Sequence, residues 1–111
     1  MSLDHLNNVP GVTAQPEAAT SQFVFNHTML RVKNIEKSLD FYTRVLGFSL
    51  VEKRDFAEAQ FSLYFLALVD KSTIPEDDKA RTTWMKSMPG ILELTHNHGT
   101  ENDADFAYHD G

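Results

Sequence analysis

The order of the periodic segments constrains the fold of this chain more than any other sequence feature. In residues 25–33, side chains suited to a core alternate with mostly polar ones, as in a half-buried strand. Asn34 is a good helix N-cap, apolar residues recur at helical spacing from Ile35 to Leu46, and Gly47 is typical of the position after a helix. Three more strand-like segments follow, at 48–54, 61–69 and 91–97. The sequence therefore predicts an α+β module of βαβββ order.

The remaining segments are expected to lie outside the sheet. Residues 1–22 predict a flexible N-terminal arm with at most a short helix near Pro16, and residues 99–111 predict a polar connector after a module spanning 23–98. The charged segment 70–89 is longer than an ordinary connection and predicts an insertion with a short helix at about 79–88. Because one helix covers one face of a sheet, we expect a second module after Gly111 to bury the other face.

Composition excludes several classes of function. The chain has 111 residues, which favours a single domain, and no apolar run approaches the roughly 20 residues of a membrane helix. Without a secretory signal, a cytoplasmic location is expected. Ten basic residues against sixteen acidic ones give a net charge of −6, and the basic residues are not clustered, which argues against a nucleic-acid partner. With no cysteine, a metal would have to be held by His, Glu or Asp.

Strand parity places several polar side chains on one face of the predicted sheet. Neighbouring residues of a strand point to opposite faces. His27 and Arg31 share one parity of the first strand, and Glu93 and Asn97 share one parity of the last. Burying such groups without partners costs free energy, so their convergence indicates a metal, a ligand or an ion pair. The opposite parity suits packing against the helix and contains Thr28, Leu30, Val32, Leu92 and Leu94.

Each polar residue also has a purely structural interpretation. A single histidine such as His27 is more often structural than a ligand, and Glu93 could pair with Arg31. Arg31 alone is typical of a surface, and Asn97 of a strand end. The residue spacing does not favour a metal site among the histidines near the C-terminus, which have the helix-packing parity or lie in the connector: His96, His98 and His109.

Four sequence strings are long enough to compare with known families. They are residues 27–32, 38–47 and 61–67, and residues 92–97 followed by Gly99-Thr100-Glu101. Together they resemble the glyoxalase I family of the vicinal oxygen chelate superfamily, from about Phe23 to the C-terminus. The resemblance implies a fold of paired βαβββ modules, of which this chain is the N-terminal one. The long segment 70–89, with Ile74-Pro75, resembles the branch that typically uses zinc.

The resemblance also implies a role for each converging residue. His27 and Glu93 match two metal ligands, with Zn²⁺ expected and Ni²⁺ or Co²⁺ also compatible. Arg31 and Asn97 match positions that hold glutathione. His98 stands where the family has Trp, a departure that concerns local packing but neither ligand. The residues that match the surroundings of the pocket for the apolar part of the thiol adduct are Phe56, Phe61, Leu63 and Phe65.

The activity implied by the resemblance is that of a lactoylglutathione lyase. This enzyme isomerises the hemithioacetal of methylglyoxal and glutathione to S-lactoylglutathione, moving a proton from C1 to C2. A dication stabilises the oxyanion that forms, and a carboxylate carries the proton. Glu93 is expected to be a ligand and an acid/base for one substrate enantiomer, whereas the principal base would come from the second module.

Two alternative functions remain open, and the chain is expected to form a homodimer. An Fe(II) dioxygenase of the same superfamily would have no use for Arg31 and Asn97. A non-catalytic module that binds a small molecule would have no need of the ligands His27 and Glu93. A homodimer is expected, because two copies would together supply two His and two Glu and would cover both exposed sheet faces.

Overall fold

Four strands form one mixed sheet in the computed structural model, which describes residues 3–107. The sheet order is β1-β4-β3-β2, with β1 parallel to β4, and β3 antiparallel to both β4 and β2. The predicted βαβββ order is confirmed, although the first and third strands are shorter than predicted and the second is longer. The strands are β1 (His27–Arg31), β2 (Ser49–Phe56), β3 (Phe61–Ala67) and β4 (Ile91–Asn97).

The helix between β1 and β2 begins as predicted but ends in a wider turn. α2 (Ile35–Asp40) has Asn34 as its N-cap, whose side chain accepts a hydrogen bond from the main-chain N–H of Lys37 at 3.1 Å. The next turn, η2 (Phe41–Val45), is a π-helix. The Thr43 hydroxyl donates to the Leu39 carbonyl at 2.6 Å, which is the acceptor that an α-helix would reserve for the Thr43 N–H. Gly47 then reverses the chain at φ 81°, the conformation predicted for it.

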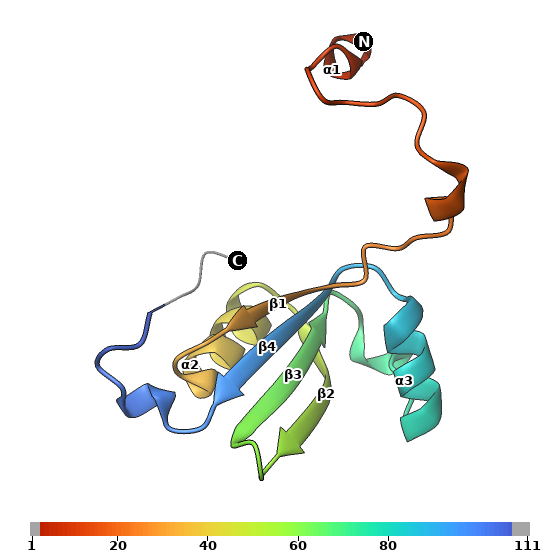
Figure 1. The fold of residues 1–111 in the computed structure, drawn as a ribbon. Helices are drawn as coiled ribbons and strands as arrows, with labels where there is room; N and C mark the ends of the chain where they lie inside the picture. The colour runs from red at the N-terminus through yellow and green to blue at the C-terminus, as the bar shows by residue number, and fades with distance from the viewer. Residues whose placement is uncertain (1–2, 108–111) are drawn as a thin grey trace.

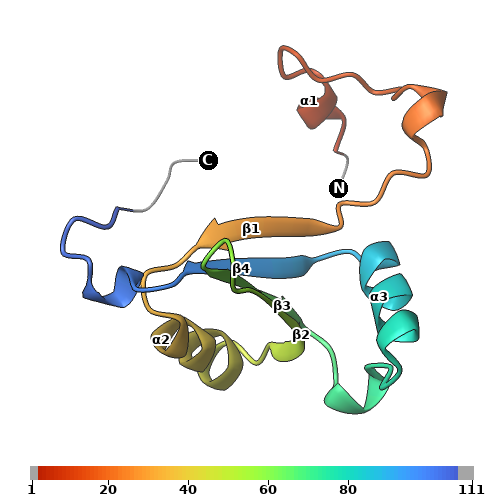
Figure 2. The ribbon, with the colours of Figure 1, turned by 60° about the horizontal axis from the view of Figure 1, so that its bottom comes forward.

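α2 packs on one face of the sheet (Figure 2). Leu66 of β3 and Leu94 of β4 are completely buried there, among Val32 and Tyr64. Residues that are partly buried against this cluster include Ile35, Leu39, Tyr42, Phe48 and Leu92. The predicted packing of Leu92 and Leu94 beneath the helix is therefore confirmed.

The prediction that Thr28, Leu30 and Val32 pack beneath the helix was wrong for most of β1. All five residues of this strand are exposed, including Thr28 and Leu30, and only Val32, just after the strand, is buried. Leu30 does lie on the α2 side, where it lines a groove with Phe41 and Tyr42. Among residues 3–107, β1 is an edge strand with one neighbouring strand, so less of the core covers it.

The long connection between β3 and β4 covers part of the opposite face. It contains η3 (Lys71–Thr73) and α3 (Asp78–Ser87), close to the short helix predicted at 79–88. Met85 of α3 is buried against Phe65 and Ile91. Arg81 joins α3 to the sheet by a 3.1 Å ion pair with Glu52 of β2. The face opposite α2 is thus covered at the end where β4 begins, which corrects the expectation of a wholly bare face (Figures 1 and 2).

The N-terminal segment leads away from the sheet (Figure 1). Residues 3–25 are exposed throughout. They contain two single turns, α1 (Asp4–Asn7), which was not predicted, and η1 (Ala18–Thr20), close to the turn expected near Pro16. η4 (Thr100–Asn102) follows β4. Within residues 3–107, no helix has the length and apolar character that a membrane span requires.

Candidate functional site

The strand register aligns the predicted site residues on the sheet face opposite α2, which we call the open face. Residues paired directly across neighbouring strands point to the same face. His27 pairs with Ile91 at the end of this face that α3 covers. Three rows of paired residues cross the rest of it: Met29, Glu93, Phe65 and Glu52; Arg31, Thr95, Leu63 and Arg54; and Asn97, Phe61 and Phe56. Parity therefore predicted the shared face correctly.

His27 and Glu93 are diagonal neighbours on adjacent strands. Glu93 lies two residues beyond Ile91, the partner of His27. Adjacent strands are about 4.8 Å apart and two residues advance a strand by about 6.7 Å, so the two Cα atoms lie roughly 8 Å apart. Side chains of this length that leave one face at that separation can approach a common cation.

The Glu93 side chain is half-buried and has no partner in the described part of the chain. It takes part in no side-chain hydrogen bond or ion pair there. The ion pair with Arg31, the simplest structural alternative, is not formed, and the Arg31 side chain is itself exposed and unpaired within residues 3–107. A carboxylate in this position loses hydration without gaining a hydrogen bond, so it favours a cation.

The two ring nitrogens of His27 differ in their hydrogen bonding. Its Nδ1 atom lies 2.8 Å from Oδ1 of Asn26, so that nitrogen already has a hydrogen-bond partner. The Nε2 atom has none within residues 3–107. A histidine that binds a metal commonly uses one nitrogen for the metal and the other for a hydrogen bond to oxygen. The two donors therefore fit a metal such as Zn²⁺.

A cavity of about 130 Å³ lies between α3 and the open face. It brings together two predicted site residues, His27 and Phe65, but not the other predicted ones. Glu93, Arg31 and Asn97 lie farther along the face, as do Phe56, Phe61 and Leu63. The cavity is lined by Asn26, His27, Arg54, Phe65, Met85, Lys86 and Ile91.

The sequence analysis missed Arg54, which lies over this cavity. Its guanidinium carbon is 5.7 Å from the centre of the Phe65 ring, and it donates a hydrogen bond to the Thr82 hydroxyl at 3.3 Å. It places a half-buried positive charge where an apolar pocket was expected. The sequence did contain a signal for Arg54. It lies two residues before Phe56 on the same strand, so both side chains point to the same face.

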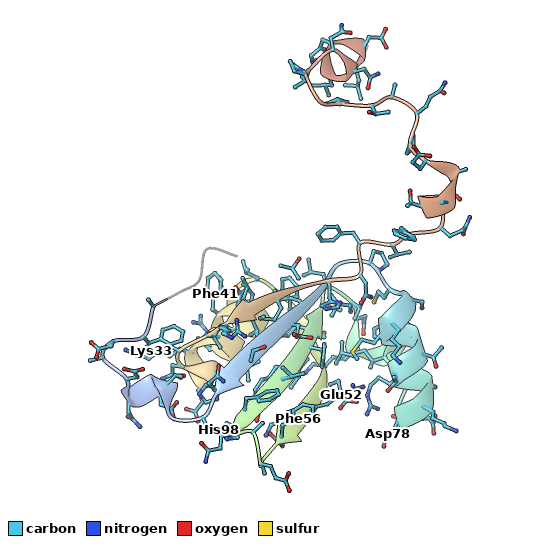
Figure 3. All side chains as sticks on the ribbon, in the orientation of Figure 1. Lys33, Phe41, Glu52, Phe56, Asp78 and His98 are labelled. Atoms are coloured by element: carbon cyan, nitrogen blue, oxygen red, sulfur yellow. The ribbon has the colours of Figure 1, made fainter. Side chains whose placement is uncertain are left out.

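The predicted apolar residues do not form a single cluster. Phe65 is buried under Arg54 and α3, whereas Phe56 and Phe61 stack on each other with ring centres 4.7 Å apart. Figure 3 shows Glu52 next to α3 and Phe56 farther along β2. The stacked pair lies in the row of Asn97, so it belongs to the end of the open face distant from α3.

Two of the C-terminal histidines are engaged away from His27 and Glu93. His96 is buried, with Nε2 2.9 Å from the Glu101 carboxylate. The pKa of Glu101 is held below its usual value by a hydrogen bond from its own main-chain N–H and by His96. His98 contacts the hydroxyl of Ser62. His109 lies outside the described residues.

The described residues supply only part of a metal-ligand set. Within residues 3–107, no group of three or more His, Cys, Asp or Glu side chains is arranged to hold a metal ion. Metal sites of proteins usually have three or four protein ligands. His27 and Glu93 thus fit half of a site that other residues would complete.

The fold defines the class of this protein. A structure of the trypanothione-dependent glyoxalase I of Leishmania major superimposes with a TM-score of 0.50 and 28% sequence identity, over 75% of this chain and 51% of that one. The family model of the glyoxalase/bleomycin resistance protein/dioxygenase superfamily matches residues 24–110. The chain belongs to this superfamily. Membership of the glyoxalase family implies a metal cofactor in general.

Two curated bacterial proteins are more similar to this chain in sequence than the Leishmania protein is. The chain is 79% identical to a lactoylglutathione lyase of Pseudomonas putida over all 111 of its residues, which cover 64% of that protein. It is 49% identical to a lactoylglutathione lyase of Pseudomonas aeruginosa over 102 residues, covering 92% of this chain and 57% of that protein. The chain therefore spans less than two thirds of the length of these relatives.

Proposed function

We propose that this chain provides one half of the active site of a lactoylglutathione lyase. The observation that carries the proposal is the half-buried carboxylate of Glu93, which has no partner among residues 3–107 and lies diagonally across from His27 on the open face. The names of the two Pseudomonas relatives support the reaction. The substrate would be the glutathione hemithioacetal of a 2-oxoaldehyde, in a cytoplasmic setting. The Fe(II) dioxygenase and the non-catalytic binding module gain no comparable support.

His27 Nε2 and a Glu93 carboxylate oxygen would hold the metal, for which Zn²⁺ is our first choice. When bound, the cation supplies positive charge that stabilises the oxyanion developing on the substrate. The remaining ligands would come from a second module or from a second copy of this chain. The proposal thus accounts for a site that is only half present in residues 3–107.

The other residues of the open face would hold the substrate and move its proton. The Arg31 guanidinium would bind a glutathione carboxylate, and the Asn97 amide would bind a peptide group of glutathione. The stacked Phe56 and Phe61 would contact apolar parts of the adduct. A Glu93 carboxylate oxygen would take the proton from C1 and return it to C2 for one substrate enantiomer, so that the reaction consumes and releases no proton.

Replacing Arg31 by Ala is expected to weaken the binding of an S-alkylglutathione by about 10-fold, because a charged hydrogen bond is lost. Calorimetric titration of wild type and variant with the same ligand would measure the effect. Arg44→Ala is a matched control, since Arg44 is exposed on the α2 side and pairs with Asp40. Its affinity should equal that of wild type. Metal loss in Arg31→Ala would show that the roles are wrongly assigned.

The isolated chain is expected to hold metal weakly as a monomer and more firmly as a homodimer. Two ligands seldom retain a dication against water, whereas two copies would contribute two His27 and two Glu93 side chains. Sedimentation velocity at micromolar concentration, with and without Zn²⁺, would measure the oligomeric state. A monomer that is indifferent to zinc would contradict the dimeric site.

A further inference from the structure

Asn26 connects the candidate ligand His27 to the end of α3. Its side-chain amide nitrogen donates to two main-chain carbonyls there, of Met85 at 2.9 Å and of Met88 at 2.6 Å. Carbonyls in the last turn of a helix lack partners within the helix, so the Asn26 amide caps α3. The main chain around Asn26 is also fixed, because its carbonyl accepts from the Ile91 N–H at 2.8 Å. Asn26 is thus held on two sides.

These contacts determine which way the amide faces. An amide NH₂ group has two hydrogens, and both are used by the two carbonyls. The reversed amide would bring its oxygen against two carbonyl oxygens with no hydrogen between them. The oxygen Oδ1 must therefore face His27, whose Nδ1 lies 2.8 Å away.

The direction of the amide in turn determines the tautomer of His27. An amide oxygen can only accept, so the Nδ1 atom of His27 must carry the hydrogen. In neutral imidazole the other nitrogen, Nε2, then has the free lone pair that a metal needs. We propose that Asn26 is a positioning residue that locks His27 in the Nδ1–H tautomer and so presents Nε2 to the open face. This inference rests on the proposed role of His27 as a metal ligand.

The contact also links α3 to the candidate metal site. α3 is held against the sheet by the burial of Met85 and by the ion pair of Arg81 with Glu52. The carbonyls that orient Asn26 therefore belong to a packed helix rather than to a free loop. Loss of the Asn26 amide should leave His27 free to exchange tautomers and to rotate, and should weaken metal binding by 10-fold or more.

The tautomer can be read directly by ¹⁵N NMR of the metal-free 111-residue chain at about pH 8, above the ordinary histidine range. Protonated and unprotonated ring nitrogens differ in their ¹⁵N shifts, and His27→Ala assigns the His27 signals. Wild type should show a protonated Nδ1 and an unprotonated Nε2. Asn26→Ala should show a mixture, because no acceptor then holds the hydrogen on Nδ1.

Leu39→Ala serves as the structural control. It loosens the packing of α2 on the opposite face and leaves α3 and its carbonyls in place, so stability should fall while the His27 tautomer stays unchanged. A wild-type His27 protonated on Nε2, or an Asn26→Ala chain with the wild-type tautomer, would overturn the inference. So would a Leu39→Ala chain that changes the tautomer as much as Asn26→Ala does.

Titration of the same samples with ZnCl₂ separates this inference from the proposed function. The His27 signals of wild type should respond at zinc concentrations at least about 10-fold lower than those of Asn26→Ala. Equal zinc affinities in wild type and Asn26→Ala would contradict the positioning role. If the wild-type His27 and Glu93 signals do not shift when zinc is added, the proposed metal site is contradicted, whichever tautomer His27 has.

Discussion

Replacing Leu66 by Ala is expected to lower the free energy of unfolding by about 2–5 kcal/mol. Leu66 has no exposed surface and lies in the cluster that joins β3 and β4 to α2. Truncation would remove buried contacts and leave a cavity that its neighbours fill only in part. Urea unfolding followed by circular dichroism would measure the loss.

Leu68→Ala provides the matched control for this prediction. Leu68 lies two residues farther along the chain and is 65% exposed, so the same truncation should change stability by less than about 0.5 kcal/mol. Equal losses in the two variants would show that the cluster beneath α2 does not form the stable core. A Leu66→Ala chain that is already unfolded in buffer would fit the predicted loss if Leu68→Ala remains folded.

Replacing Glu93 by Gln is expected to lower metal affinity and lyase activity together, each by at least ~10-fold, in a protein whose ligand set is complete. Gln has nearly the same shape but no charge, so the fold should survive while an anionic ligand is lost. Metal content per chain and the rate of S-lactoylglutathione formation would be measured on the same preparation.

Glu58→Gln is the control for the loss of charge. Glu58 is exposed in the turn between β2 and β3, distant in sequence from both candidate ligands, and should keep full metal content and activity. A Glu93→Gln enzyme with unchanged metal content and full activity would reject Glu93 as a ligand. Loss of activity with retained metal would leave Glu93 an acid/base group but not a required ligand.

The sequence predicted the order of elements and the shared face because both depend on local rules. Alternation in β1 and β4 determines which side chains point together, and the Asn34 cap and Gly47 define the helix from neighbouring residues alone. The same rules placed His27 and Glu93 on one face, and the parallel register makes them diagonal neighbours. The roles of these residues came only from the family resemblance.

The features that the sequence did not predict depend on contacts between distant segments. Arg54 lies over Phe65 because α3 returns to the open face, and Asn26 is oriented by carbonyls some sixty positions away. The exposure of Leu30 depends on the sheet order, which makes β1 an edge strand. Neither propensity nor periodicity contains this information.

The pairing of the first strand with the last has a consequence for how the chain folds. β2 and β3 form a hairpin with a short turn, so they can meet early, whereas β1 pairs in register only with β4. On a ribosome that releases the chain from its N-terminus, β1 leaves first and has no strand to join until residues 91–97 emerge. Until then β1 is an unpaired edge strand, open to pairing with another nascent chain, so the first strand to emerge is the last to be paired.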